Sequence, residues 1–192
     1  MKLTNLTTNF LGKTSFFYKT IDSTQSEIWR RIKENKIDNG TLIMADIQEN
    51  GKGTHGRIWH TDEENNIAFS FFIETNCNIK KIEGLTIEIA NIILDIFKEK
   101  YEIQLEIKKP NDIVYHNKKI GGILTETKLI SETVKYLVIG IGLNTSKEQF
   151  SEDIKDIATS IKKEFGVEVN RKEFIVEFCN RFEKYILERI EQ

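Results

Sequence analysis

The sequence predicts an α+β fold in which a mixed or antiparallel sheet is flanked by helices. Short segments with strand character occur in runs, and two consecutive hairpins join some of them. Segments with the apolar spacing of helices lie between and after these runs. Runs of strands next to helices are typical of α+β domains. At 192 residues, we expect one domain over residues 1–192, with a core that needs no disulfide or metal.

The amino-terminal elements are predicted to be a strand, a helix and a second strand. Residues 15–18 are rich in aromatic side chains, which favours a strand. Ser23 offers an N-cap for a helix over about residues 23–35. After an Asn-Gly turn, residues 41–45 form an apolar strand that leads into a long glycine-rich loop.

The middle of the chain predicts three strand regions around one helix. Residues 67–73 are a strand, and an apolar stripe over residues 85–96 indicates a helix that packs on the core. Residues 103–108 alternate between apolar and polar side chains, as in a half-buried strand. Residues 113–115 and 119–126 are predicted to be the two strands of a tight hairpin.

The last third predicts a central strand followed by two amphipathic helices. Residues 136–144 are almost entirely apolar, which indicates a strand buried on both faces. The last helix carries an apolar stripe of aromatic and aliphatic side chains. These are Phe174, Phe178, Phe182, Tyr185 and Ile186.

The composition is that of an ordinary globular protein, with 39% hydrophobic and 30% charged residues. A net charge of −2 argues against a nucleic-acid-binding surface, which needs an excess of Lys and Arg. Cys77 and Cys179 have no Cys or His at ligand spacing, so a metal site is not expected. The sequence contains no apolar run of the length needed for a signal peptide or a membrane span, so we expect a cytoplasmic protein.

The segment over residues 48–59 carries the strongest functional signal. Its glycines, Gly51, Gly53 and Gly56, let the backbone turn sharply and approach a ligand closely. Successive free N–H groups in such a turn can bind an anion such as phosphate. Lys52 and Arg57 add positive charge, and Trp59 offers a flat apolar face for a purine or an aliphatic ring system.

Two familiar nucleotide motifs do not fit this segment. Gly51, Gly53 and Gly56 match the G-x-G-x-x-G pattern, but a dinucleotide site needs a helix to begin within it, and a strand follows here. The terminal Gly-Lys-Ser/Thr of a P-loop is absent. The remaining alternatives are a ligand-binding loop between two strands and a surface hairpin loop with chance charges.

Two other segments each admit a structural and a functional interpretation. Residues 22–25, Asp-Ser-Thr-Gln, can cap the first helix, and their hydroxyls and amide can also bind a neutral polar group. Lys108 lies where a strand stops before Pro110, so its side chain either enters a cleft or remains a solvated charge.

Glycines within the later strands raise a similar choice. Gly121 and Gly122 indicate either a bulge or the close approach of a ligand or another backbone. Gly140 and Gly142 fall on one face of the central strand, which would leave room over the sheet for a flat or bulky ligand. Asn144 follows them, and its side-chain amide can form hydrogen bonds with such a ligand.

Five segments, in this order along the chain, resemble the motifs of the biotin protein ligases. They are residues 22–25, 48–59, 108–112, 119–124 and 139–144. Together the resemblance covers about residues 15–190.

This resemblance implies an enzyme that activates biotin with ATP to biotinyl-5'-AMP, releasing pyrophosphate. The enzyme would then transfer biotin to a specific lysine of a biotin carboxyl carrier protein. The implied fold is related to class II aminoacyl-tRNA synthetases, and Mg²⁺ would accompany ATP. The implied partners are the carrier domain and, as one option, a second copy in a homodimer, with no nucleic acid and no membrane.

The resemblance also implies roles for individual residues. Lys108 and Arg57 are expected to be catalytic. The residues expected to bind biotin are Ser23, Thr24, Gln25, Gln48, Lys52, Gly53, Thr54, Lys108, Gly121, Gly122, Gly140 and Gly142. Those expected to bind ATP or the adenylate are Gly51, Lys52, Gly56, Arg57, Trp59, Asn111, Lys119 and Asn144. No protein ligand set for a metal is expected.

The chain departs from the family pattern in four places. Thr54 stands where many ligases have an arginine, and Lys109 where the family usually has a tryptophan. No winged helix is expected before residue 15, so repressor activity is not expected, and the small C-terminal β-barrel of many members is expected to be absent. The alternatives are a lipoate ligase or octanoyl transferase of the same fold, and a non-catalytic biotin- or nucleotide-binding protein.

Overall fold

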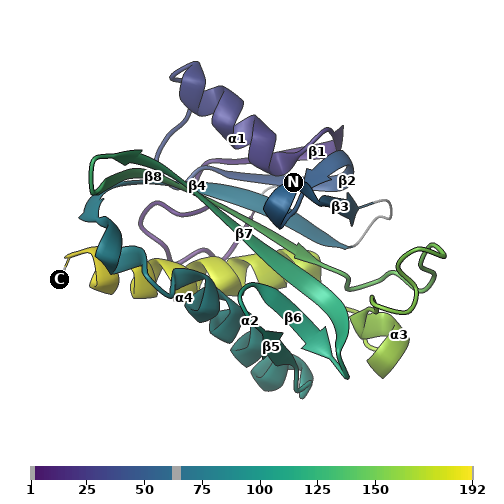
Figure 1. Cartoon of the computed structure of the whole chain (residues 1–192). Helices are drawn as coiled ribbons and strands as arrows, with labels where there is room; N and C mark the ends of the chain where they lie inside the picture. The colour runs from purple at the N-terminus through teal and green to yellow at the C-terminus, as the bar shows by residue number, and fades with distance from the viewer. Residues whose placement is uncertain (1–2, 62–65, 192) are drawn as a thin grey trace.

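The computed structural model describes residues 3–61 and 66–191, and its centre is an eight-stranded mixed sheet (Figure 1). The strands are β1 (Ser15–Ile21), β2 (Leu42–Lys52), β3 (Ile58–Thr61), β4 (Ile67–Asn78), β5 (Glu106–Lys108), β6 (Asp112–Tyr115), β7 (Lys118–Ile130) and β8 (Thr133–Leu143). The strand order is β1-β2-β4-β8-β7-β6-β5, and β3 pairs with β2 beside this path. Only the β1–β2 pair is parallel among the described strands. The predicted α+β class is confirmed.

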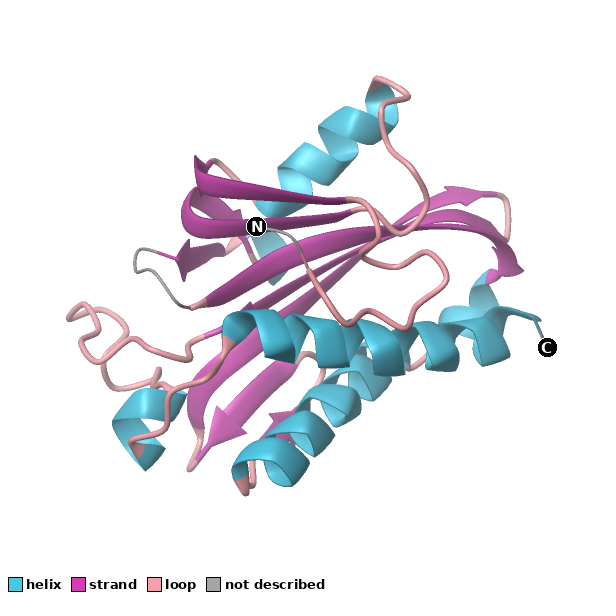
Figure 2. Ribbon diagram, turned by 180° about the vertical axis from the view of Figure 1, so that it is seen from behind, coloured by secondary structure: helices cyan, strands magenta, loops and turns pink. Residues whose placement is uncertain are grey.

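Helices cover the two faces of the sheet unequally. Helix α1 (Thr24–Lys33) lies on one face, and α2 (Leu85–Tyr101) and α4 (Arg171–Glu191) lie side by side on the other (Figures 1 and 2). The short helix α3 (Ile161–Phe165) lies beyond the end of β8, after a long connection. Two 3₁₀ turns complete the set, η1 (Thr54–Gly56) and η2 (Ile79–Ile82).

The main core lies between the sheet and helices α2 and α4. The rings of Phe69 and Phe71 on β4 face the last helix, with centroids 5.6 Å from Phe178 and 5.2 Å from Phe182, respectively. All four rings are fully buried. Edge-to-face pairs at these distances add to the free energy that burial of the rings supplies.

A smaller core lies under α1 on the opposite face. Ile28 of the helix packs with Ile43, Phe72 and Val138 of the sheet, and all four are buried. A helix rises less per residue than a strand, so the ten-residue α1 is much shorter than the twelve-residue β4 and the eleven-residue β8. This cluster therefore covers only part of the face. Part of the sheet is thus left for other groups to cover.

The amino-terminal segment is held against the last helix. The Glu183 carboxylate, almost fully buried, accepts backbone N–H groups from Asn9, Phe10 (3.0 Å) and Leu11 (2.8 Å). A buried carboxylate needs such donors, because its charge would otherwise be costly in the protein interior.

Most predicted elements are confirmed, the strand predicted over residues 103–108 is shortened to Glu106–Lys108, and two other elements differ. The glycine-rich segment is not a long loop: β2 continues to Lys52 and pairs with β3, so residues 51–59 form a hairpin closed by Gly53 N–H donating to the Arg57 carbonyl at 2.8 Å. The first of the two final helices is only the five-residue α3. The hairpin escaped prediction because polar and glycine residues rarely indicate a strand.

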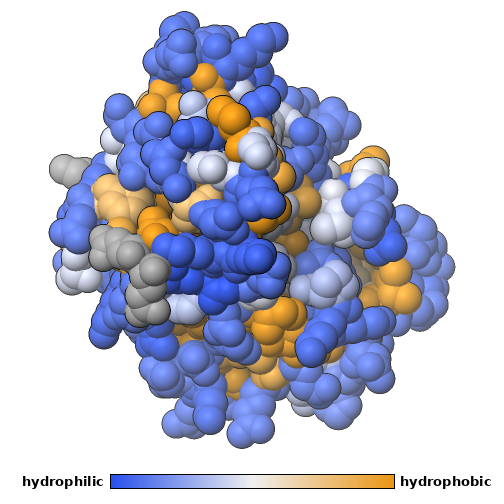
Figure 3. All heavy atoms as spheres, turned by 60° about the vertical axis from the view of Figure 1, so that its left-hand side comes forward, coloured by the Kyte–Doolittle hydropathy of each residue, from blue (hydrophilic) through white to orange (hydrophobic). Residues whose placement is uncertain are grey.

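The surface is mostly hydrophilic with small apolar patches on the face seen in Figure 3. Within the part of the chain that the structure describes, no helix is long and apolar enough to cross a membrane. Cys77 and Cys179 are both buried free thiols.

Candidate active site

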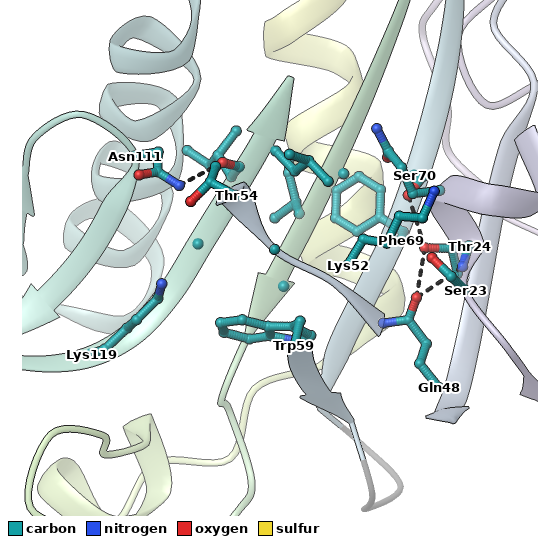
Figure 4. A pocket seen from close by; sticks show the side chains of 18 residues that line it. Ser23, Thr24, Gln48, Lys52, Thr54, Trp59, Phe69, Ser70, Asn111 and Lys119 are labelled. Carbon is teal, nitrogen blue, oxygen red and sulfur yellow. Dashed lines mark hydrogen bonds between the residues drawn. The ribbon is translucent and has the colours of Figure 1, made fainter. Parts of the chain in front are cut away.

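A cavity of about 440 Å³, including the solvent at its mouth, opens on the face of the sheet that carries α1 (Figure 4). Eighteen residues line it: Ser23, Thr24, Gln25, Gln48, Lys52, Gly53, Thr54, Trp59, Phe69, Ser70, Asn111, Lys119, Gly122, Ile123, Leu124, Gly140, Ile141 and Gly142. Figure 4 shows Ser23, Thr24, Gln48 and Ser70 at one end, with the Lys52 side chain beside them, and Thr54, Asn111 and Lys119 at the other. One end of the cavity is therefore rich in hydroxyl and amide groups, and each end also has a lysine.

The first turn of α1 forms the end that is rich in hydroxyl and amide groups. Ser23 is the N-cap, with extended backbone, and its hydroxyl oxygen accepts the Ser26 N–H at 3.4 Å. The next two side chains, Thr24 and Gln25, are buried and line the cavity. The capping interpretation is confirmed, and the same turn carries polar side chains that line the cavity.

A chain of hydrogen bonds joins this turn to β2 and β4. Gln48 Oε1 accepts both the Thr24 backbone N–H (2.8 Å) and the Thr24 hydroxyl (3.0 Å). Gln48 Nε2 donates to the Thr61 hydroxyl at 3.1 Å, and the Ser70 hydroxyl lies 2.8 Å from that of Thr24. The orientation of the Gln48 amide is thus defined, because a backbone N–H must meet its oxygen.

Glycines form the floor of the cavity, but this chain's own side chains already fill part of the space above them. A Cβ on Gly142 would lie 2.5 Å from Nε1 of Trp59, and one on Gly140 would lie 2.7 Å from Oε1 of Gln25. The predicted open room over both glycines is therefore corrected: the Trp59 indole covers Gly142, and the Gln25 amide covers Gly140.

Gly121 and Gly122 differ from each other. A Cβ on Gly122 would point into the cavity, 3.3 Å from Lys119 Nζ, whereas one on Gly121 would overlap the buried Leu143 side chain. Gly121 does not line the cavity and lies on the main-core side of the strand, so the expectation that it faces the ligand is corrected. The β6–β7 register also shifts opposite these glycines, so a bulge and a close approach both occur.

The hairpin of β2 and β3 supplies the roof. Lys52, Gly53 and Thr54 line the cavity together with Trp59. A Cβ on Gly51 would overlap the Trp59 carbonyl oxygen, so the glycine is needed for the two strands to approach.

Two further groups of the hairpin lie away from the cavity. Gly56 has φ +74°, in the left-handed region that favours glycine. Arg57 is exposed and borders a second hollow.

Lys119 is the cation whose position is best defined. Its Nζ lies 2.6 Å from Asp112 Oδ1 and 5.6 Å from the centre of a Trp59 ring. The carboxylate and the indole hold the ammonium group at the end of the cavity opposite Thr24.

Lys108 is exposed at the end of β5 and is not among the residues that line the cavity. The sheet register nevertheless puts it on the ligand side: Lys108 pairs with Asp112, Asp112 with Gly122, and Gly122 with Gly142. Directly paired residues face the same side of a sheet. Lys108 is therefore two strands away from the glycine floor, on the same face.

The second hollow lies on the far side of Trp59 and holds about 730 Å³ including open solvent. Its lining is Arg57, Ile58, Trp59, His60, Lys119, Asn144, Lys147, Phe150, Ile154, Ile157 and Ala158. Ile58 and Ile157 are 60% and 63% exposed, so they present apolar surface at this hollow. Trp59 and Lys119 belong to both hollows, so they form the wall between them.

The two asparagines expected at the nucleotide also donate hydrogen bonds within the protein. Asn144 Nδ2 donates to the Thr159 carbonyl at 3.2 Å, and Asn111 Nδ2 donates to the Ile123 carbonyl at 3.0 Å. Asn144 borders the second hollow and Asn111 the first. Both side chains are thus anchored where they meet a cavity.

Sequence reasoning missed several of the lining residues. Ser70 lies inside an apolar strand, and only its pairing with Gly140 would have placed it at the cavity floor. Phe150, Ile154 and Ile157 come from a polar stretch without regular spacing, where nothing indicated a pocket wall. Among residues 3–61 and 66–191, no group of three His, Cys, Asp or Glu side chains could hold a metal ion.

Comparison with known proteins identifies a family and relatives of this chain. A model described as the biotin/lipoate A/B protein ligase family matches residues 17–144. The bifunctional ligase/repressor BirA of Bacillus subtilis (strain 168) is 33% identical over 181 residues, which are 93% of this chain and 55% of that protein. The biotin–protein ligase of Homo sapiens is 27% identical over 172 residues, covering 86% of this chain and 23% of that protein.

A solved structure is similar over almost the whole chain. The biotin protein ligase from Aquifex aeolicus in complex with biotin and ATP superimposes with a TM-score of 0.76 at 31% identity, covering 94% of this chain and 73% of that chain. The chain spans about half the length of the curated bacterial relatives it matches. These similarities confirm the predicted synthetase-like fold.

Proposed function

Because the chain belongs to the biotin/lipoate A/B protein ligase family, we propose that it activates biotin with ATP and transfers it to a lysine of a carrier protein. One catalytic domain over the 192 residues carries both steps. The observation that carries this proposal is the two-ended cavity, with the hydroxyl and amide groups of Ser23, Thr24 and Gln48 at one end and Lys119 at the other. Biotin has the same two ends, a neutral ureido ring and a carboxylate.

The end of the cavity with the hydroxyl and amide groups suits the ureido ring. Ser23, Thr24 and Gln25 at the helix N-terminus and Gln48 on β2 supply donors and acceptors. Hydrogen bonds hold them in place: Thr24 donates to Gln48, Ser23 accepts the Ser26 N–H, and Gln25 donates to the Val138 carbonyl. Lys52, Gly53, Thr54, Gly122, Gly140 and Gly142 form the walls around the rest of the molecule. Binding in a preformed site costs less ordering of side chains.

The second hollow suits the nucleotide. Trp59, Ile58 and Ile157 offer apolar surface for a base, and Asn144 and Arg57 add polar and charged groups. Since Trp59 divides the two hollows, biotin in one and ATP in the other would meet at the edge of its ring. Lys119 borders both sides of this meeting point.

In the first step a biotin carboxylate oxygen attacks the α-phosphorus of ATP and pyrophosphate leaves, so that a mixed anhydride with AMP forms. Negative charges approach one another in this step, and fixed cations stabilise the charge that develops on the phosphate. Lys108, Arg57, Lys52 and Lys119 are the candidates, with the hairpin amides at Gly51 and Gly56. Mg²⁺ would accompany ATP and neutralise charge on its phosphates, and an ion bound mainly to phosphate needs few protein ligands.

In the second step the acceptor amine attacks the anhydride carbonyl, AMP leaves and the amine loses a proton. The acceptor of this proposal is a lysine of a biotin carboxyl carrier protein. No covalent link to the enzyme forms. A homodimer stays a prediction, to be checked by light scattering on the purified protein.

The proposal is tested by ATP–pyrophosphate exchange with biotin, lipoate or octanoate as the only carboxylic acid. Exchange that depends on biotin supports the ligase. Exchange with lipoate or octanoate alone would favour the other enzymes of this family. Biotin binding without any exchange would favour a non-catalytic binding protein.

A further inference from the structure

The Gln25 side chain has a feature that the proposed function does not explain. Its carbonyl oxygen is buried and has no hydrogen-bond partner within the described parts of the chain, although the residue is only 2% exposed. An unpaired buried carbonyl is costly, and natural proteins seldom keep one without a reason. The oxygen lies at the cavity floor, 2.7 Å from the position of a Cβ on Gly140.

Two acceptors hold the amide in this orientation. Gln25 Nε2 donates to Glu126 Oε2 and to the Val138 carbonyl, both at 3.0 Å. Both N–H groups of the amide are therefore used, and a rotated amide would set its oxygen against two other oxygens. Trp29 Nε1 also donates to the same carboxylate oxygen, at 2.6 Å.

A second acceptor faces the same point. The Thr24 hydroxyl donates its one proton to Gln48, so the Ser70 hydroxyl must be the donor in the bond between them. Ser70 Oγ then presents lone pairs, 3.2 Å from the Cβ position on Gly140. The floor over Gly140 thus carries two hydrogen-bond acceptors.

We propose that Glu126 is a positioning residue that holds the Gln25 amide so that its oxygen accepts an N–H of the substrate. This inference rests on the proposed function and adds a basis for choosing the substrate. A ureido ring carries N–H donors, whereas the chain ends of octanoate and lipoate have none and leave both acceptors unpaired. Glu126 therefore selects a ring with N–H groups over an apolar chain, without touching the substrate.

Glu126→Gln tests this role, with Trp29→Phe as its matched control. A glutamine at 126 replaces the charged carboxylate by a neutral and weaker acceptor, so it holds the Gln25 amide less firmly. Trp29→Phe removes the other donor to Glu126 and leaves the Gln25 contact. We expect biotin affinity by calorimetry, and the KM for biotin in exchange, to worsen about tenfold in Glu126→Gln and less than about twofold in Trp29→Phe. The kcat at saturating biotin should stay within about twofold in both.

A double-mutant cycle separates positioning from general support of the fold. Gln25→Met keeps the length of the side chain but removes the acceptor, so Glu126→Gln should have no further effect on biotin affinity in that background. Octanoate should bind Gln25→Met at least as tightly as it binds the wild type. The melting temperature of every variant is measured alongside.

The inference is overturned if Glu126→Gln binds biotin like the wild type, if Trp29→Phe weakens binding equally, or if the effect of Glu126→Gln persists with Met at position 25. A wild type that binds biotin but supports no exchange would overturn the proposed ligase activity alone. The calorimetric comparison would still decide the role of Glu126.

Discussion

Gly142→Ala is expected to disrupt the wall between the two hollows with little loss of folded protein. The new Cβ would lie 2.5 Å from Nε1 and 2.8 Å from Cζ2 of Trp59, while ordinary contact begins near 3.4 Å. The backbone at this position is paired with Ala68 on one side and Gly122 on the other, so the strand cannot yield. The indole must therefore move by roughly 1 Å.

The size of the effect follows from how the indole is held. Forcing an extra methyl group into a packed site typically costs about 1–3 kcal/mol. Trp59 is half-buried and on a hairpin, so it can swing away from the sheet, and the cost falls on ligand binding. We expect kcat/KM in biotin-dependent exchange to fall roughly 5- to 100-fold, with a melting temperature within a few degrees of the wild type.

Gly121→Ala is the matched control on the neighbouring strand. Its Cβ would overlap the Leu143 side chain, which is fully buried and cannot swing away. We expect a clear loss of melting temperature and a normal KM for the folded fraction. A Gly142→Ala enzyme with wild-type kcat/KM, or one that unfolds like Gly121→Ala, would refute the assignment of Trp59 as the shared wall.

Three further outcomes are expected. Lys108→Ala should slow exchange about 100-fold or more with the fold intact, because phosphate charge goes uncompensated. The exchange rate of the control, Lys109→Ala, should stay within a few-fold of the wild-type rate. A near-normal rate for Lys108→Ala would show that Lys108 is not catalytic. Arg57→Ala should release adenylate and biotinylate an unrelated bystander protein, whereas bystander labelling by the wild type would mean that the native hairpin does not retain it. Arg30 hydrogen-bonds Asp22 and lowers the pKa of that carboxyl, so the stabilisation is present at neutral pH and lost as pH falls below the ordinary Asp range. Arg30→Ala should therefore lower the melting temperature near pH 7 but not near pH 2, and equal losses at both would contradict this pairing.

The fold was largely predictable because its strands and helices carry strong local patterns. The aromatic run around Phe69 and the apolar stripe of α2 each identify an element without tertiary information. The hairpin around Gly53 did not, since its strands are defined by pairing and not by composition.

The candidate site was predictable in its motifs and not in its geometry. Ser23, Thr24, Gln25 and Gln48 line one cavity as expected, whereas the space over Gly142 is taken by a tryptophan from a hairpin more than eighty residues earlier in the chain. Sequence separation hides such contacts, because only the register of the sheet brings the two together. Glu126 was missed for the same reason: its partners lie about a hundred residues away.

The packing of α4 on the sheet also has a consequence for synthesis of the chain on the ribosome. Phe69 and Phe71 have been made long before Phe178 and Phe182, which cover them. At bacterial or eukaryotic elongation rates, roughly 5 to 20 s separate the two pairs. During that interval the nascent sheet exposes an aromatic surface that its own last helix has yet to cover. Asn9, Phe10 and Leu11 donate to Glu183 of the same helix, so this amino-terminal segment also becomes ordered only after α4 has been made.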